Sequence, residues 1–219
     1  MTLATLRPET ASLIRLADRD LAELWRLVAA GASAEVALRD ILPSIITEYG
    51  ALGGALAAEW YDGQRDKAGV RGAFTAIPTE PSDRGAQALI GWALREATDD
   101  ASLQALIFGG TQRRIADHVR YTVAESAVAD PRAGGWQRVG VGECKFCRML
   151  IGRGAVYSEA TADFASHDSC NCSAVPAWKG QPVPVKPYTV SPRRKLGPDG
   201  KPIPDADFER AKAWIDAHL

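Results

Sequence analysis

The chain has 219 residues, of which 46 % are hydrophobic and 24 % are charged. This length suits one large domain or one domain with a smaller appendage, and the composition is that of a globular protein that can bury a core. The net charge of -1 does not indicate a nucleic-acid partner. However, residues 1–130 hold 13 basic and 18 acidic side chains, whereas residues 131–219 hold 13 and 9. Residues 131–219 are therefore the part of the chain better suited to bind a polyanion.

The first residues, MTLATLRPETASL, have no basic stretch followed by an apolar one, so no signal peptide is predicted. Charged residues interrupt the apolar stretches well short of about 18 residues, so we expect no membrane-spanning helix and no membrane partner. Without export, the thiols are expected to stay reduced, which favours metal ligation over disulfides.

Residues 1–130 are predicted to be helical, because their apolar residues recur at steps of three and four. The first helix is expected over Glu9–Ala30. Ser33 is expected to cap a second, longer helix whose apolar series runs to Trp60. Two further helices are predicted, over about Asp83–Ala97 and about Ser102–Ala129.

The second of these helices contains residues that disfavour a continuous helix. Pro43 lies inside the apolar series and is expected to kink or split it, and Gly53 and Gly54 weaken it further. Residues 62–82 are rich in glycine and proline, and we expect them to form a loop or a linker.

The composition changes after residue 132. Residues 136–178 hold all four cysteines, with short apolar pieces that we expect to be small strands or knuckle turns. Eight of the 13 prolines fall in residues 176–204, so this segment is expected to be an extended basic arm. A last helix is predicted over about Asp205–His218.

The predicted fold is therefore mainly α, in three parts. Residues 1–132 form a helical domain. Residues 133–180 form a small zinc-knuckle-like Cys/His module with minor β structure. Residues 181–219 form the Pro-rich basic arm and the terminal helix.

Four cysteines and one histidine lie within 29 residues, in the pattern C-x2-C-x19-H-x2-C-x-C. These five candidate metal ligands are Cys144, Cys147, His167, Cys170 and Cys172. Thiolates and imidazoles at short paired spacings are what tetrahedral Zn²⁺ requires. A site closed by four protein ligands has no position for water, so a structural zinc that supports folding is predicted rather than hydrolysis.

Five candidate ligands are one more than a tetrahedral site uses. The preferred set is the four cysteines. His167 is then expected to support these ligands without binding the metal, or to replace one of them. The alternative set is Cys144, Cys147, His167 and Cys170. Two disulfides or unpaired thiols are the alternatives without metal, and a cysteine nucleophile with His167 as its base is the catalytic alternative.

The segment ECKFCRMLIGRGAVYSEATADFASHDSCNCSAVPAW, residues 143–178, resembles the C-terminal motif of the phage Mu-type minor head proteins. Its strip RGAVY at residues 153–157 is similar to the version found in tailed phages of actinobacteria. Two upstream pieces also resemble this group: LAAEWYD at residues 56–62 and AVADPR at residues 127–132. The resemblance covers about residues 35–180, and the cysteine cluster is its most specific part.

The resemblance implies a minor capsid protein that acts in head morphogenesis. Such proteins are similar in having a helical N-terminal region and a small Cys/His-rich C-terminal region. They lie inside the virion head near the portal, after assembly in the host cytoplasm, and act in assembly or in DNA packaging and ejection. The implied partners are the portal protein, the major capsid protein and packaged double-stranded DNA.

Relatives in actinobacterial phages are also labelled capsid maturation proteases, which makes a protease the alternative function. The sequence itself favours no enzyme. It has no G-x-S-x-G or H-E-x-x-H motif, and neither His118 nor His218 has a neighbouring serine in a strand–turn context.

A third reading is a head protein that binds DNA without sequence preference. Arg113, Arg114 and Arg120, with His118, form a predicted basic patch on the fourth helix, for which the alternative is a solvated helix face. The run Arg193-Arg194-Lys195 in the extended arm is the better candidate for phosphate contact, with a solubilising tail as its alternative.

Replacing Arg193, Arg194 and Lys195 with alanine tests the DNA-binding reading. If these side chains neutralise phosphates, the plot of log affinity against log salt should become shallower by about one unit per residue removed. The measurement is the fluorescence anisotropy of a labelled duplex at several salt concentrations. Removal of three arginines from residues 1–130 is the control, and an unchanged slope in the arm variant would contradict the prediction.

Overall fold

The computed structural model describes residues 3–80, 83–140, 145–157, 164, 166, 170, 172–178, 213 and 217. Four long helices come first: α1 (Leu3–Ala29), α2 (Ala34–Lys67), α3 (Asp83–Glu96) and α4 (Asp100–Ala129). They are followed by β1 (Trp136–Val139), α5 (Lys145–Gly152) and β2 (Ser173–Pro176). The predicted fold class, mainly α with a small cysteine module of minor β structure, is confirmed. The basic arm lies outside the described residues; of the predicted last helix, Ala213 and Ala217 are described and are helical.

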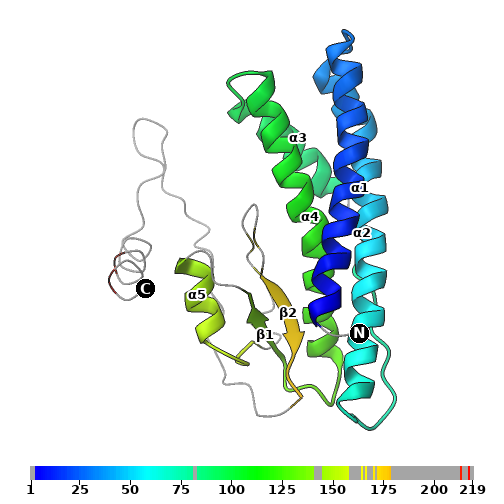
Figure 1. Cartoon of the computed structure of the whole chain (residues 1–219), viewed down its shortest axis with the longest axis vertical. Coiled ribbons are helices and arrows are strands. Elements are labelled where there is room, and N and C mark those ends of the chain that lie inside the picture. The colour runs from blue at the N-terminus through cyan, green and yellow to red at the C-terminus, as the bar shows by residue number, and fades with distance from the viewer. Residues whose placement is uncertain are drawn as a thin grey trace.

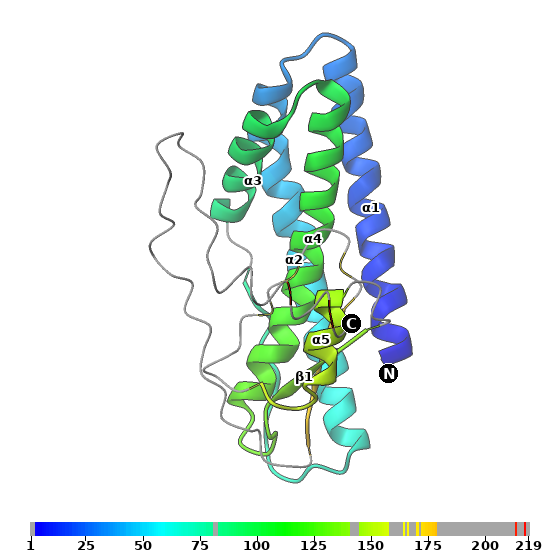
Figure 2. The ribbon, with the colours of Figure 1, turned by 90° about the vertical axis from the view of Figure 1, so that its left-hand side faces the viewer.

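Helices α1, α2 and α4 run side by side along the long axis of the molecule (Figure 1). Helices α1 and α3 lie on opposite sides of the α2–α4 pair (Figure 2). The small module of β1, β2 and α5 lies beside one end of this bundle, where both strands contact α4. The core between the four helices includes Leu21, Leu24, Leu38, Leu42, Ile90, Ile107 and Ile115.

Pro43 was predicted to kink or split α2; the helix is continuous over 34 residues, so Pro43 does not split it. A proline inside a helix costs about 3 kcal/mol, because one hydrogen bond is lost and the ring meets the preceding turn. Leu38 and Leu42 are fully buried beside it. Each such side chain contributes about 1.5–3 kcal/mol, which offsets the cost of the proline.

The helix boundaries differ from the prediction at three other places. The predicted loop was expected to begin at residue 62, but α2 continues to Lys67. Helix α1 begins at Leu3 rather than Glu9, because Leu6 is buried in the core shared with the small module. Helix α4 begins at Asp100, where the side chain of Asp99 accepts a hydrogen bond from the backbone N–H of Ser102 at 2.7 Å.

Glycines on α2 let α4 approach closely. A Cβ atom added at Gly50 would lie 2.5 Å from Cδ2 of His118, closer than atoms can pack, so the imidazole ring occupies the space that a side chain would need. A Cβ atom at Gly53 would lie 3.1 Å from Cγ2 of Val119. These glycines lower the intrinsic stability of α2 but allow the tight α2–α4 contact.

A buried ion pair joins the ends of α2 and α4. The Nε atom of Arg65 donates to Oδ2 of Asp130 at 2.8 Å, and both side chains are buried. Nη1 of Arg65 also donates to the main-chain oxygen atoms of Val70 and Gly72, at 3.2 and 2.7 Å. Burial and the neighbouring Asp130 carboxylate raise the pKa of Tyr61, whose hydroxyl donates to the same carboxylate. These contacts fasten the loop after α2 to the end of the bundle.

By length and composition alone, α2 could cross a membrane. Its apolar side chains are instead packed against the other helices: Leu38, Leu42, Ile45, Ile46, Trp60 and Tyr61 are all buried. A helix whose apolar residues face neighbouring helices on several sides has the arrangement of the central helix of a globular bundle.

Two leucines on α2 test this role. Leu38 is 0 % exposed and Leu52 is 53 % exposed. We expect Leu38→Ala to lower the free energy of unfolding by about 2–5 kcal/mol, because it leaves a cavity in the core. Leu52→Ala should change it by no more than about 0.5 kcal/mol. Urea unfolding followed by circular dichroism measures both, and equal losses would contradict a central position for α2.

Candidate metal centre

Three of the five predicted ligands meet in one buried cluster. Cys147 lies on α5, and Cys170 and Cys172 lie just before β2. Their Sγ atoms are all within 4.8 Å of one another, and all three residues are buried. No disulfide joins these cysteines. Cys144 and His167 lie outside the described residues, as do Arg193, Arg194 and Lys195.

The two short strands bring the cysteine segments together. Strands β1 and β2 pair antiparallel, with Arg138 opposite Ala174 and Val139 opposite Ser173. Gly140 follows β1 directly, and a Cβ atom added there would lie 2.9 Å from Sγ of Cys172. Glycine is therefore needed where the chain leaving β1 passes the cluster.

Tyr157 holds helix α5 to β1. This helix lies in residues 136–178, where small strands or knuckle turns were expected. Trp136 and Tyr157 exchange main-chain hydrogen bonds, with N···O distances of 3.1 and 3.3 Å. The Tyr157 hydroxyl donates to the carbonyl oxygen of Leu150, at the far end of α5 from Cys147, at 3.2 Å. Burial raises the pKa of Tyr157, so this hydroxyl keeps its proton and remains a donor. Cys147 is thereby placed by both a helix and an aromatic anchor.

An aromatic stack lies behind the cluster. The indole of Trp136 stacks on Tyr157, with 4.4 Å between ring centroids, and on Phe164, with 5.6 Å. The guanidinium carbon of Arg138 lies 3.9 Å from the centroid of the Phe164 ring, and that of Arg120 lies 5.3 Å from it. The Phe164 ring thus contacts two buried cations, and each contact is worth up to about 2 kcal/mol when it is desolvated.

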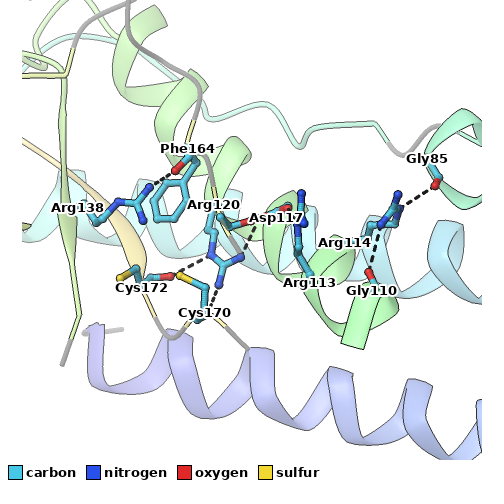
Figure 3. Close-up of polar contacts among 11 residues, drawn as sticks. Gly85, Gly110, Arg113, Arg114, Asp117, Arg120, Arg138, Phe164, Cys170 and Cys172 are labelled. Carbon is cyan, nitrogen blue, oxygen red and sulfur yellow. Dashed lines mark hydrogen bonds and ion pairs between the residues drawn. The ribbon is translucent and has the colours of Figure 1, made fainter. Parts of the chain in front are cut away.

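Arg120 connects helix α4 to the segment that carries Cys170 and Cys172 (Figure 3). Its Nε donates to the carbonyl oxygen of Cys172 at 2.9 Å, and its Nη2 donates to the carbonyl oxygen of Cys170. Its Nη1 pairs with Oδ1 of Asp117 at 2.7 Å. Asp117 also accepts a hydrogen bond from Oγ of Ser166 at 2.5 Å.

The predicted basic patch on α4 is therefore wrong for Arg120, which is buried. Arg113 is exposed beside Asp117, and Arg114 donates to the main-chain oxygen atoms of Gly85 and Gly110. His118 packs against Gly50 of α2. The four basic residues therefore point into different surroundings and form no common surface.

The surroundings of the Cys172 thiol favour its protonated form. A hydrogen bond with the Cys170 thiol raises the pKa of Cys172, and burial and Cys147 act in the same direction. A bound divalent cation reverses this preference, because coordination deprotonates thiols outright. Metal uptake by this cluster is therefore expected to release protons.

The donor set fits a soft divalent ion such as zinc. A Zn–S bond of about 2.3 Å implies about 3.8 Å between sulfur atoms of a tetrahedral site, which is compatible with three Sγ atoms that lie within 4.8 Å of one another. The three buried cysteines could therefore hold a metal ion.

The roles of Arg120, Arg138 and Phe164 in this site were not predicted from the sequence. One signal for Arg120 was available: it lies three residues before Val123 in the apolar series of α4. A second was the alternation of Trp136 and Arg138, which puts both on one face of a strand. Neither signal by itself indicates a buried cation.

A family model described as VG15 protein matches residues 1–195. No curated protein matches the chain. No solved structure matches it either.

Metal binding can be measured on protein purified under reducing conditions. We expect about one zinc per chain, and tetrahedral thiolate absorption bands when cobalt replaces it. Cys147→Ser, Cys170→Ser and Cys172→Ser should each weaken binding strongly, because each removes a ligand. Comparing Cys144→Ser with His167→Ala identifies the fourth ligand. Wild-type protein that binds no zinc and has four reactive thiols would contradict the site.

Proposed function

This chain belongs to the VG15 protein family, and we propose that it is a minor capsid protein of a tailed bacteriophage that acts in head morphogenesis. The proposal has two supports. One is the resemblance of residues 143–178 to the motif of Mu-type minor head proteins. The other is the convergence of Cys147, Cys170 and Cys172 in a module seated on a helical bundle, and this observation carries the proposal.

The zinc in this proposal is structural. Cys147, Cys170 and Cys172 hold it, with Cys144 or His167 as the fourth ligand. A closed site of this kind contributes folding free energy and offers no open position to a substrate. Its role is to keep the small module ordered against α4, so that bundle and module present one fixed surface to a partner.

In this proposal the partner is the portal protein or the major capsid protein. The protein lies inside the head, close to packaged double-stranded DNA, after assembly in the host cytoplasm. The bundle offers α1 and α3 on opposite sides of the α2–α4 pair as contact surfaces. A rigid body with two outer helical faces suits a component that contacts neighbours in an assembly.

The proposal includes no catalytic step. His118, the one histidine in the described part of the chain, packs its ring against Gly50. Its Nδ1 atom is buried without a hydrogen-bond partner among the described residues, and burial lowers its pKa. These surroundings suit a packing residue better than the base of a protease, which is the alternative function.

Co-expression with the portal, scaffold and major capsid proteins of the same phage tests the proposal. We expect the chain to copurify with assembled heads at low copy number and without cleavage of any component. Cys170→Ser/Cys172→Ser should abolish its incorporation, because the module loses its metal. Leu52→Ala, on the exposed face of α2, is the matched control.

Two outcomes would contradict this function. Heads that assemble normally with no chain bound would exclude a structural component. Shortening of a capsid or scaffold protein that one serine, lysine or cysteine substitution abolishes would identify the protease instead.

A further inference from the structure

Arg120 contacts the main chain of two metal-ligand candidates rather than their thiols. The carbonyl groups of Cys170 and Cys172 both accept hydrogen bonds from its guanidinium. Because these carbonyl groups belong to the residues that carry two of the clustered sulfur atoms, fixing them limits where the sulfur atoms can lie. The side chain is only 5 % exposed, so water competes little for these bonds.

The guanidinium is itself held in place from α4. Asp117, one turn earlier in the helix, accepts from Nη1 of Arg120 at 2.7 Å. Asp117 is in turn bonded to Ser166, and the Phe164 ring packs over the guanidinium (Figure 3). One planar group therefore binds a helix, two carbonyl oxygen atoms and an aromatic ring at once. Lysine cannot reproduce this geometry, because its ammonium group is a point charge.

We propose that Arg120 is a positioning residue that couples metal occupancy of the cysteine cluster to the stability of the helical bundle. This inference rests on the proposed zinc site. If Arg120 holds the Cys170–Cys172 segment in the metal-binding arrangement, then bound metal must stabilise the contact with α4 by the same factor. Metal binding to the module would then strengthen a helix that contacts all the other long helices of the bundle.

The charge of the site agrees with this coupling. Three or four thiolates on one divalent ion carry a net negative charge, and a buried net charge is unfavourable unless it is compensated. Arg120 is buried and bonded to the carbonyl groups of Cys170 and Cys172, and the buried guanidinium of Arg138 packs on the Phe164 ring. The positive charge of Arg120, held at the main chain of Cys170 and Cys172, would compensate such a site.

The test uses the full chain and zinc titrated against a chelator of known affinity. Arg120→Met should weaken zinc binding by about 10- to 100-fold, the usual effect of removing a group that orients metal ligands. Arg113→Met is the matched control, because Arg113 lies on the same helix, pairs with the same Asp117 at 3.6 Å, and is 42 % exposed. Its zinc affinity should stay at the wild-type value. Arg120→Lys keeps the charge but should still bind zinc more weakly than wild type.

The second readout is the thermal unfolding of the helices by far-ultraviolet circular dichroism, with zinc and with chelator. Zinc should raise the melting temperature of wild type and of Arg113→Met, and raise that of Arg120→Met clearly less. If Arg120 only supported the fold, Arg120→Met would lower the melting temperature equally with zinc and with chelator. The rise in melting temperature caused by zinc would then keep its wild-type size. Wild-type zinc affinity and wild-type thermal shift in Arg120→Met would overturn the inference and leave the zinc site standing.

Two further results are informative. If Arg120→Met is unfolded even with zinc present, Asp117→Asn keeps the arginine but removes its anchor. This variant should show weaker zinc binding in the same direction, and unchanged affinity would overturn the inference. If wild-type protein itself binds no zinc, the proposed metal site fails and the coupling fails with it.

Discussion

The buried guanidinium of Arg120 is the interaction on which the union of bundle and module depends. A cation removed from water is stable only where hydrogen-bond acceptors surround it. Asp117 supplies one acceptor from α4, and the carbonyl oxygen atoms of Cys170 and Cys172 supply two from the cysteine segment. Moving the module away from α4 would leave this charge and these carbonyl groups unsatisfied. The orientation of the module is therefore set by polar contacts as well as by apolar packing.

The module is too small to be stable by apolar burial alone. Its two strands have four residues each and α5 has eight, so few side chains can be removed from water within it. It overcomes this by sharing a core with the bundle, in which Trp60 and Tyr61 of α2 join Trp136, Phe164 and the cysteines. A metal ion on the thiols would add a second source of stability. The shared core, the buried arginines and the candidate metal ligands lie in one small region. A substitution that disturbs the core is therefore expected to disturb the arginines and the ligands as well.

The Arg65–Asp130 pair repeats this design at the point where α2 and α4 end. A buried arginine again combines one carboxylate with several main-chain oxygen atoms, here to hold the loop after α2. Both arginines fix irregular segments to regular helices. The helices supply the length, and the arginines determine how the remaining segments attach. A fixed attachment of this kind suits the proposed role in an assembled phage head.

The sequence by itself determined the long helices, since the period of apolar residues is a local property that survives in any tertiary context. It also predicted candidate metal ligands from the clustered cysteines, and three of them, Cys147, Cys170 and Cys172, lie together. Only the tertiary structure decided that Pro43 does not split α2, that Cys147 lies on a helix, and that Arg120 is buried. Arg120 and its partner Cys172 are 52 residues apart in the chain. Whether an arginine faces water or a carbonyl oxygen depends on such distant contacts, which no local pattern contains.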